Sequence, residues 1–175
     1  NLDAAYQLGN YLAWDRRYEE ALGIFGEILA KDPHNEDAEI GIARVNAWKG
    51  AQAAAINKYG EILQKYPGNF EAYQGLGTLA LWTNDFEKSI GFFEKALKIN
   101  PEDLVSLKGI GRTYLGRGDR RRAEEFFTRA QILEIKKTPL PFLIGIVAGS
   151  LILFLFLFLL IRSWIVKRKK ILLQM

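Results

Sequence analysis

Few residues of this 175-residue chain have the type and spacing that catalysis requires. The chain contains no cysteine, so neither a thiolate nucleophile nor a thiolate metal site can form. Its single histidine, His34, lies in a proline-containing turn without a second metal ligand next to it. Adjacent carboxylates such as Glu19 and Glu20 point apart on a helix and form no acid–base pair. We therefore expect no catalytic residue, no metal ion, no cofactor and no small-molecule substrate.

The elements that position the remaining side chains follow from an internal repeat. Three independent classes of residue recur with the same interval of 34 residues, which chance does not explain. The three series are Pro33, Pro67 and Pro101; Trp14, Trp48 and Trp82; and Asn1, Asn35, Asn69 and Asp103. The chain from residue 1 to 135 therefore divides into four units, 1–34, 35–68, 69–102 and 103–135.

Each unit is predicted to be a pair of helices. The Asn and Asp series precedes an apolar-periodic run, where a side-chain oxygen can accept from the free N–H groups of a first helical turn. The prolines lie just beyond the second helix and end it. The predicted helices lie near residues 2–14, 18–31, 36–48, 52–65, 70–82, 86–99, 104–116 and 120–135.

Pairs of large and small residues indicate how these helices pack. In the first helix a large residue is followed by a small one, as in Leu8 and Gly9, which lets the two helices approach closely. In the second helix a small residue precedes an aromatic residue by one turn, as in Ala21 and Phe25. These stripes are predicted to form the core.

The period of 34 with these pairs and a terminal proline resembles the tetratricopeptide repeat, from residue 1 to about 135. The early-helix tryptophan of the motif is absent, and the fourth unit has Gly116 and Ile135 in place of its tryptophan and proline. A divergent last repeat is expected where a stack ends. The resemblance implies an all-α fold, a right-handed α-solenoid of four helical hairpins. The residues after these hairpins predict a single transmembrane helix, as their charge pattern shows below.

The resemblance also implies where a partner protein binds. In this family the first helix of each hairpin lines the concave side, and extended peptides or partner helices dock there. The matching positions form a candidate protein-binding groove: Tyr6, Asn10, Trp14, Arg44, Trp48, Gln74, Thr78, Trp82, Lys108 and Arg112. Aromatic and hydrogen-bonding side chains dominate the energy of many interfaces. Alternatively, each tryptophan only covers the turn between its two helices.

The charge distribution argues against a nucleic-acid partner. The chain has a net charge of +4, but residues 1–135 hold 17 basic and 20 acidic residues. The other seven basic residues flank an apolar segment near the C-terminus, so the excess positive charge belongs to these flanks. Residues 104–135 are locally basic, with seven basic and four acidic residues. This surface is interpreted either as facing anionic lipid headgroups or an acidic partner, or as an ordinary solvated face.

A transmembrane helix is predicted over residues 142–164. Its first 20 residues, 142–161, carry no charge and as a helix span about 30 Å, the thickness of the hydrocarbon core of a bilayer. A linker, 136–141, contains two prolines and separates this helix from the last repeat. Gly145, Gly149 and Ser150 form a small-residue face on which another transmembrane helix could pack.

The orientation of this helix is predicted from its flanking charges. Five basic residues follow the uncharged run 142–161 and two precede it, which favours a cytoplasmic tail, 165–175, and repeats on the periplasmic or extracytoplasmic side. That topology requires a signal peptide upstream, and we expect the natural chain to continue before Asn1. The competing topology is a tail anchor with cytosolic repeats.

Two functions fit these features. The first is a non-catalytic scaffold, or an assembly subunit of a larger membrane complex, whose partners are other protein subunits and the lipid bilayer. The second is an adaptor or receptor that recruits a soluble client to the membrane. A folded enzyme preceding Asn1 is a third alternative.

Overall fold

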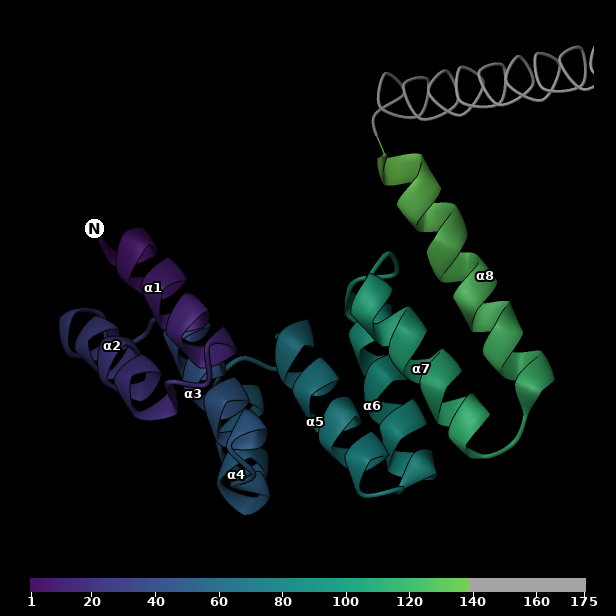
Figure 1. Ribbon diagram of the computed structural model, residues 1–175, viewed down its shortest axis with the longest axis horizontal. Coiled ribbons are helices and arrows are strands. Elements are labelled where there is room, and N and C mark those ends of the chain that lie inside the picture. The colour runs from purple at the N-terminus through teal and green to yellow at the C-terminus, as the bar shows by residue number, and fades with distance from the viewer. Residues whose placement is uncertain (139–175) are drawn as a thin grey trace, which may run out of the picture. The chain divides into compact units, whose positions relative to one another are not determined.

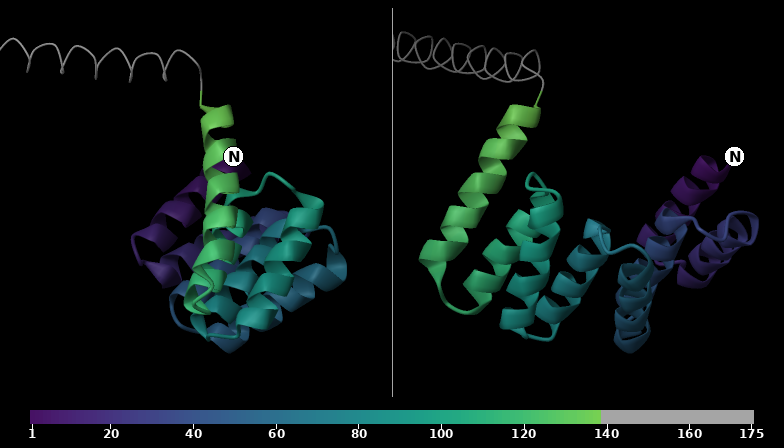
Figure 2. Two further views of the ribbon diagram at one scale, coloured as in Figure 1. Left: turned by 90° about the vertical axis from the view of Figure 1, so that its right-hand side faces the viewer. Right: turned by 180° about the vertical axis from the view of Figure 1, so that it is seen from behind.

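The computed structural model describes residues 1–138, which form eight helices and no strand (Figure 1). The bounds of the helices are α1 (Leu2–Trp14), α2 (Tyr18–Lys31), α3 (Glu36–Trp48), α4 (Gln52–Lys65), α5 (Phe70–Trp82), α6 (Phe86–Ile99), α7 (Leu104–Gly116) and α8 (Arg120–Lys137). Each helix from α1 to α6 packs on the next helix in the chain, and the two views of Figure 2 show the same succession of hairpins. The predicted all-α solenoid of helical hairpins is confirmed.

The predicted bounds match the first seven helices, whereas α8 ends at Lys137 instead of at residue 135. The second helices of the first three repeats have 14 residues and α8 has 18. Ile135 stands where the other repeats have proline, so nothing stops the helix there. The N–H and hydroxyl groups of Thr138 both donate to the Glu134 carbonyl and close the last turn. The first two residues of the predicted linker are therefore helical.

The four predicted N-caps are confirmed. Each side-chain oxygen accepts a hydrogen bond from a backbone N–H in the first turn of its helix, at 2.8–3.0 Å. Because these N–H groups have no partner inside the helix, each cap stabilises it by about 1 kcal/mol. The capping residues are Asn1, Asn35, Asn69 and Asp103.

The turn inside each hairpin contains one residue with left-handed backbone geometry. These residues again lie 34 positions apart: Arg16 (φ 65°), Gly50 (φ 86°), Asn84 (φ 59°) and Gly118 (φ 84°). Glycine adopts this geometry without steric cost and asparagine tolerates it, whereas arginine rarely does. The repeat therefore fixes the turn conformation even where the residue type is unfavourable.

Aromatic rings of the second helices hold the hairpins together. Phe25 is fully buried between Gly9 of α1 and Gly41 of α3. A Cβ atom at Gly9 or Gly41 would lie 2.7 or 2.6 Å from a carbon of this ring. The same contacts recur for Tyr59 with Gly75, Phe93 with Gly77 and Gly109, and Phe127 with Gly111. The predicted core stripe is confirmed. Its first three aromatic rings also contact the first helix of the next hairpin.

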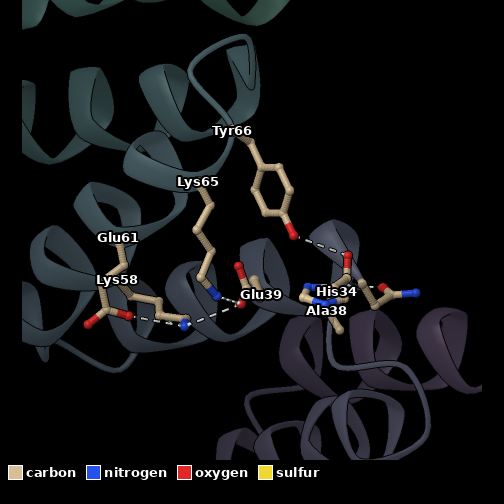
Figure 3. A network of polar contacts seen from close by, with 8 residues as sticks. His34, Ala38, Glu39, Lys58, Glu61, Lys65 and Tyr66 are labelled. Atoms are coloured by element: carbon tan, nitrogen blue, oxygen red, sulfur yellow. Dashed lines mark hydrogen bonds and ion pairs between the residues drawn. The ribbon is translucent and has the colours of Figure 1, made fainter.

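One carboxylate is buried within the second hairpin (Figure 3). A Glu39 oxygen on α3 accepts a hydrogen bond from Lys65 Nζ at 2.7 Å and lies 3.8 Å from Lys58 Nζ, both on α4. Lys58 also pairs with Glu61 at 3.2 Å. Because a buried charge must be compensated, these lysines hold α3 and α4 in register.

Residues 1–133 form one compact unit, and the last turn of α8 is assigned to a second unit that begins at Glu134. Among residues 1–138, no helix combines the length and apolar content needed to cross a bilayer. The segment predicted to do so, 142–164, lies outside the described residues, as do its packing residues Gly145, Gly149 and Ser150, the rest of the linker and the tail 165–175.

Candidate protein-binding surface

The three repeating tryptophans are the last residues of α1, α3 and α5. Their exposed fractions are 76% for Trp14, 42% for Trp48 and 48% for Trp82. Trp48 and Trp82 thus bury about half of their surface against the protein, and Trp14 buries little. Each ring keeps enough free surface to contact a partner.

Arg44 connects the first two repeats at this surface. Its guanidinium donates to Asn10 Oδ1 at 2.5 Å and lies 5.6 Å from the ring centre of Trp48. Asn10 and Arg44 occupy the same position in consecutive repeats. The guanidinium thus contacts both the first repeat, through Asn10, and the face of the Trp48 ring in its own repeat.

Gln74 has a corresponding role between the third and fourth repeats. Its side-chain amide donates to Asp103 Oδ2 at 2.6 Å, and the same oxygen accepts the Ser106 N–H at 2.8 Å. The Asp103 carboxylate, buried in the structure, therefore caps α7 and binds α5 at once. The side-chain amide of Gln74 therefore already makes a hydrogen bond within the fold, which reduces what it can offer to a partner.

Acidic side chains surround Glu71 at the start of α5. Partial burial raises the pKa of Glu71 above its ordinary value, Arg44 opposes this shift, and the charges of Asp37 and Asp103 add to it. Asp37 and Glu71 occupy the same position in consecutive repeats. The spacing of 34 residues between Asp37 and Glu71 is the sequence signal for this acidic region, which joins the second, third and fourth repeats.

The other candidates differ in their availability. Tyr6 is half-buried, and its ring centre lies 5.9 Å from that of Phe25, so it belongs partly to the core. Thr78 and Lys108 are half-buried and Arg112 is exposed. Direct contacts join Asn10, Arg44 and Trp48 into one cluster, while binding of a partner by the ten candidates stays a prediction.

Two cavities lie away from the candidate residues. One, of about 300 Å³, is bounded by α4, α5 and α6 and has a mostly apolar lining that includes Ile56, Leu76, Leu79 and Phe92. The other, of about 420 Å³, lies against α1 and α2. Sequence reasoning identified neither cavity, because a cavity depends on how the packed helices meet in space.

The carboxylates singled out by sequence take separate partners. Glu19 accepts from Lys49 at 3.0 Å, and Glu20 pairs with Arg17, whose hydrogen bond lowers the pKa of that carboxyl. The backbone carbonyl of His34 accepts from the Tyr66 hydroxyl at 3.3 Å. In the part of the chain that the structure describes, no three His, Cys, Asp or Glu side chains are grouped as a metal ion requires.

Known proteins share this repeat. One family model, described as tetratricopeptide repeat, matches residues 6–69, and a second with the same description matches residues 70–103. No curated protein matches the sequence. The residues from 6 to 103, more than half of the chain, are therefore tetratricopeptide repeats.

Several solved structures have a similar fold. A thermophilic TPR protein from Thermus thermophilus superposes with a TM-score of 0.69 at 21% identity, over 77% of this chain and 75% of that one. A MamA crystal structure gives 0.62 at 23% identity, over 78% and 80% of the two chains. A MamA structure from Desulfovibrio magneticus gives 0.62 at 24% identity, over 79% and 78%. At these identities the likeness shows the fold alone.

Proposed function

We propose that this tetratricopeptide-repeat protein is a non-catalytic scaffold whose first helices bind another protein. The observation that carries the proposal is the row of exposed tryptophans at the ends of α1, α3 and α5. Repeats of this family are in general interaction modules. An aromatic ring that is half-covered by its own fold and half-free contributes much apolar area on binding and loses little side-chain entropy.

Polar contacts beside the tryptophans support the same proposal. The Arg44 to Asn10 hydrogen bond and the Gln74 to Asp103 hydrogen bond join neighbouring repeats. A surface that is ordered before its partner arrives loses less conformational freedom on binding. The partner would therefore meet a prearranged surface.

The second part of the proposal is attachment to a membrane through residues 142–164. Its support is the uncharged run 142–161 in the sequence, flanked by basic residues. The scaffold would then be an accessory or assembly subunit of a membrane complex, with Gly145, Gly149 and Ser150 facing another transmembrane helix. On the charge bias, we place the repeats on the periplasmic or extracytoplasmic side, and the alternative is a tail-anchored adaptor with cytosolic repeats.

Site-specific cross-linking in native membranes tests this proposal. A photoreactive amino acid would replace Trp48 in one variant and Gly149 in another, and captured proteins would be identified by mass spectrometry. We expect the position-48 probe to capture one protein in stoichiometric yield, and the position-149 probe to capture a membrane subunit. Failure of both probes to capture any protein would refute the scaffold.

A matched control is Gln64, an exposed residue on the second helix α4. A probe at this position should not capture the protein found at position 48. If it captures the same protein with equal yield, the first-helix surface is not the binding site.

A further inference from the structure

Two aromatic rings and two cations form a stack in repeat four. The ring of Tyr114 on α7 stacks on the ring of Phe126 on α8, with 5.8 Å between the ring centres. The guanidinium of Arg129 lies 5.4 Å from the ring centre of Phe126. The guanidinium of Arg122 lies 5.3 Å from the ring centre of Tyr114. Each ring thus contacts the other ring and one cation, which are favourable contacts for aromatic groups.

Repeat three carries the same arrangement without one ring. The equivalent residues, 34 positions earlier in the chain, are Lys95, Phe92, Ala80 and Lys88. Lys95 Nζ lies 5.7 Å from the ring centre of Phe92, which repeats the contact in repeat four. Lys88 pairs with Asp85 at 2.6 Å, and the equivalent cation and carboxylate of repeat four pair at 3.2 Å. Ala80, in the place of Tyr114, is therefore the one member of the stack that has lost its ring.

A cavity lies where this ring is missing. Phe92, Ala80 and Lys88 all line the cavity of about 300 Å³ that α4, α5 and α6 enclose. The other lining residues are Ile56, Leu76 and Leu79, which are apolar, and Gln52, Thr83 and Asp85, which are polar. The space is thus bounded by an aromatic ring and a cation, the two groups that contact Tyr114 in repeat four.

Most polar groups of this lining already have partners in the fold. Asp85 pairs with Lys88 and also accepts the Lys88 N–H at 3.3 Å, where it caps α6. The hydroxyl group of Thr83 donates to the Leu79 carbonyl at 3.2 Å. The exposed side chain of Gln52 makes no hydrogen bond to the described residues. Its amide is free to bond a polar group on an incoming ring, such as the hydroxyl of a tyrosine.

The α4 side of the cavity is also more open than the equivalent side in repeat three. Gln52 stands where α2 and α6 have the half-buried aromatic residues Tyr18 and Phe86. Ile56 is 47% exposed, whereas the equivalent Ile90 is 8% exposed. The junction of the second and third repeats therefore lacks apolar groups that the junction of the third and fourth repeats contains.

We propose that this cavity binds an aromatic side chain of a partner protein, which stacks on Phe92 beside Lys88 as Tyr114 stacks in repeat four. The choice of a protein rests on the proposed function. None of the ten candidate residues lines the cavity, but Thr83, which does, directly follows Trp82 in the chain. A single free ring makes few contacts, whereas a ring on a protein already held by the tryptophans meets the cavity at high effective concentration.

Binding of p-cresol, the tyrosine side chain as a free compound, tests the cavity before the partner is known. The full chain in phosphatidylcholine nanodiscs would be titrated and the methyl NMR signals of Leu76 and Leu79 followed. We expect saturable shifts of these signals. Ala80→Tyr should abolish the shifts, because its own ring fills the cavity as Tyr114 does in repeat four. Asn46→Tyr places the same ring at the equivalent position of repeat two and should leave the shifts unchanged.

A second variant keeps the test decisive if Ala80→Tyr does not retain the helical circular dichroism spectrum. Phe92→Leu keeps an apolar side chain but removes the ring on which the ligand stacks. Because a stacked ring pair contributes about 0.5–1.5 kcal/mol, the affinity for p-cresol should fall roughly threefold to tenfold.

Co-purification in mild detergent identifies the source of the ring. Ala80→Tyr should lose the partner protein, because the partner's aromatic side chain can no longer enter, and Asn46→Tyr should retain it. If Ala80→Tyr blocks p-cresol and retains the partner in full, the ring comes from a free aromatic compound, and the assignment to a protein is wrong.

Three outcomes would overturn the cavity itself. These are the absence of p-cresol shifts in the parent, shifts that persist in folded Ala80→Tyr, and an unchanged affinity in Phe92→Leu. Each would leave the tryptophan row as it stands. Conversely, a partner that stays bound after replacement of the three tryptophans would refute the proposed function and leave the p-cresol result intact.

Discussion

Phe25 illustrates how single residues join the repeats. Its ring lies between Gly9 of its own hairpin and Gly41 of the next, so one side chain fixes two helix contacts. The packing leaves no room for a methyl group at either glycine. Small residues at these positions are therefore a requirement of packing, independent of backbone flexibility.

Substitution of Gly41 by alanine tests this packing. The added Cβ would lie 2.6 Å from Phe25 Cζ, and such overpacking destabilises a core by about 1–3 kcal/mol. The control is Gly91→Ala in α6, where no atom lies within 4 Å of the added Cβ and helix propensity should stabilise by about 1 kcal/mol. Urea unfolding followed by circular dichroism should show opposite shifts of the midpoint. Equal shifts would contradict the packing argument.

The pKa of Glu71 gives a prediction for pH dependence. Because partial burial raises this pKa in the folded state, the folded protein binds a proton more tightly than the unfolded chain. The associated stability is present below the ordinary glutamate pKa and is lost as the pH rises through the raised value. Glu71→Gln should therefore be more stable than the parent at pH 7, and the difference should shrink in acid. Thermal unfolding of the parent and the variant, at pH 7 and at a pH below the ordinary glutamate pKa, checks this prediction. A variant less stable than the parent at pH 7 would contradict it.

For single residues, the sequence identified those that occupy the same position in different repeats better than those that touch one another in the structure. The period of 34 located the four caps, because a cap bonds to its own helix. It did not reveal that Gly41 contacts Phe25, since these residues are not one period apart. Nor did it pair Gln74 with Asp103, which needs the geometry between repeats.

At the scale of elements, α8 departs from the other second helices because it lacks their proline. Its final turn continues past the repeat, to Lys137. The predicted bounds of the other helices agree with the structure because caps and prolines mark the ends directly. For α8 the absence of a proline was visible, but the length of the extension depends on the Thr138 hydrogen bonds to Glu134.

Replacement of Ile135 by proline should remove the last turn of α8. Proline lacks the N–H group and clashes with the preceding helical turn. We expect hydrogen exchange at residues 136–138 to become fast, whereas the buried amides of α7 keep their protection. Loss of protection in α7 would show that the last turn of α8 stabilises the repeats. That result would contradict our expectation, because this turn lies outside the compact unit 1–133.

At the scale of the whole molecule, the proposal joins a repeat unit to a membrane segment. The absence of cysteine allows a clean test, because each introduced cysteine is the only thiol. Gln7→Cys and Lys169→Cys should both remain in the membrane after alkaline carbonate extraction. A membrane-impermeant maleimide added to intact cells should label only Gln7→Cys. Labelling of Lys169→Cys alone would reverse the proposed orientation, and release of both by carbonate would refute the anchor.

The central claim is that the exposed tryptophans of the first helices bind the partner protein. Its most direct measurement is the yield of the partner that co-purifies in mild detergent with the variant Trp14→Ala, Trp48→Ala, Trp82→Ala. The control variant changes three exposed isoleucines of second helices to alanine, Ile56, Ile99 and Ile132. We expect both variants to keep the helical circular dichroism spectrum and only the tryptophan variant to lose the partner. An undiminished yield with the tryptophan variant would contradict the claim.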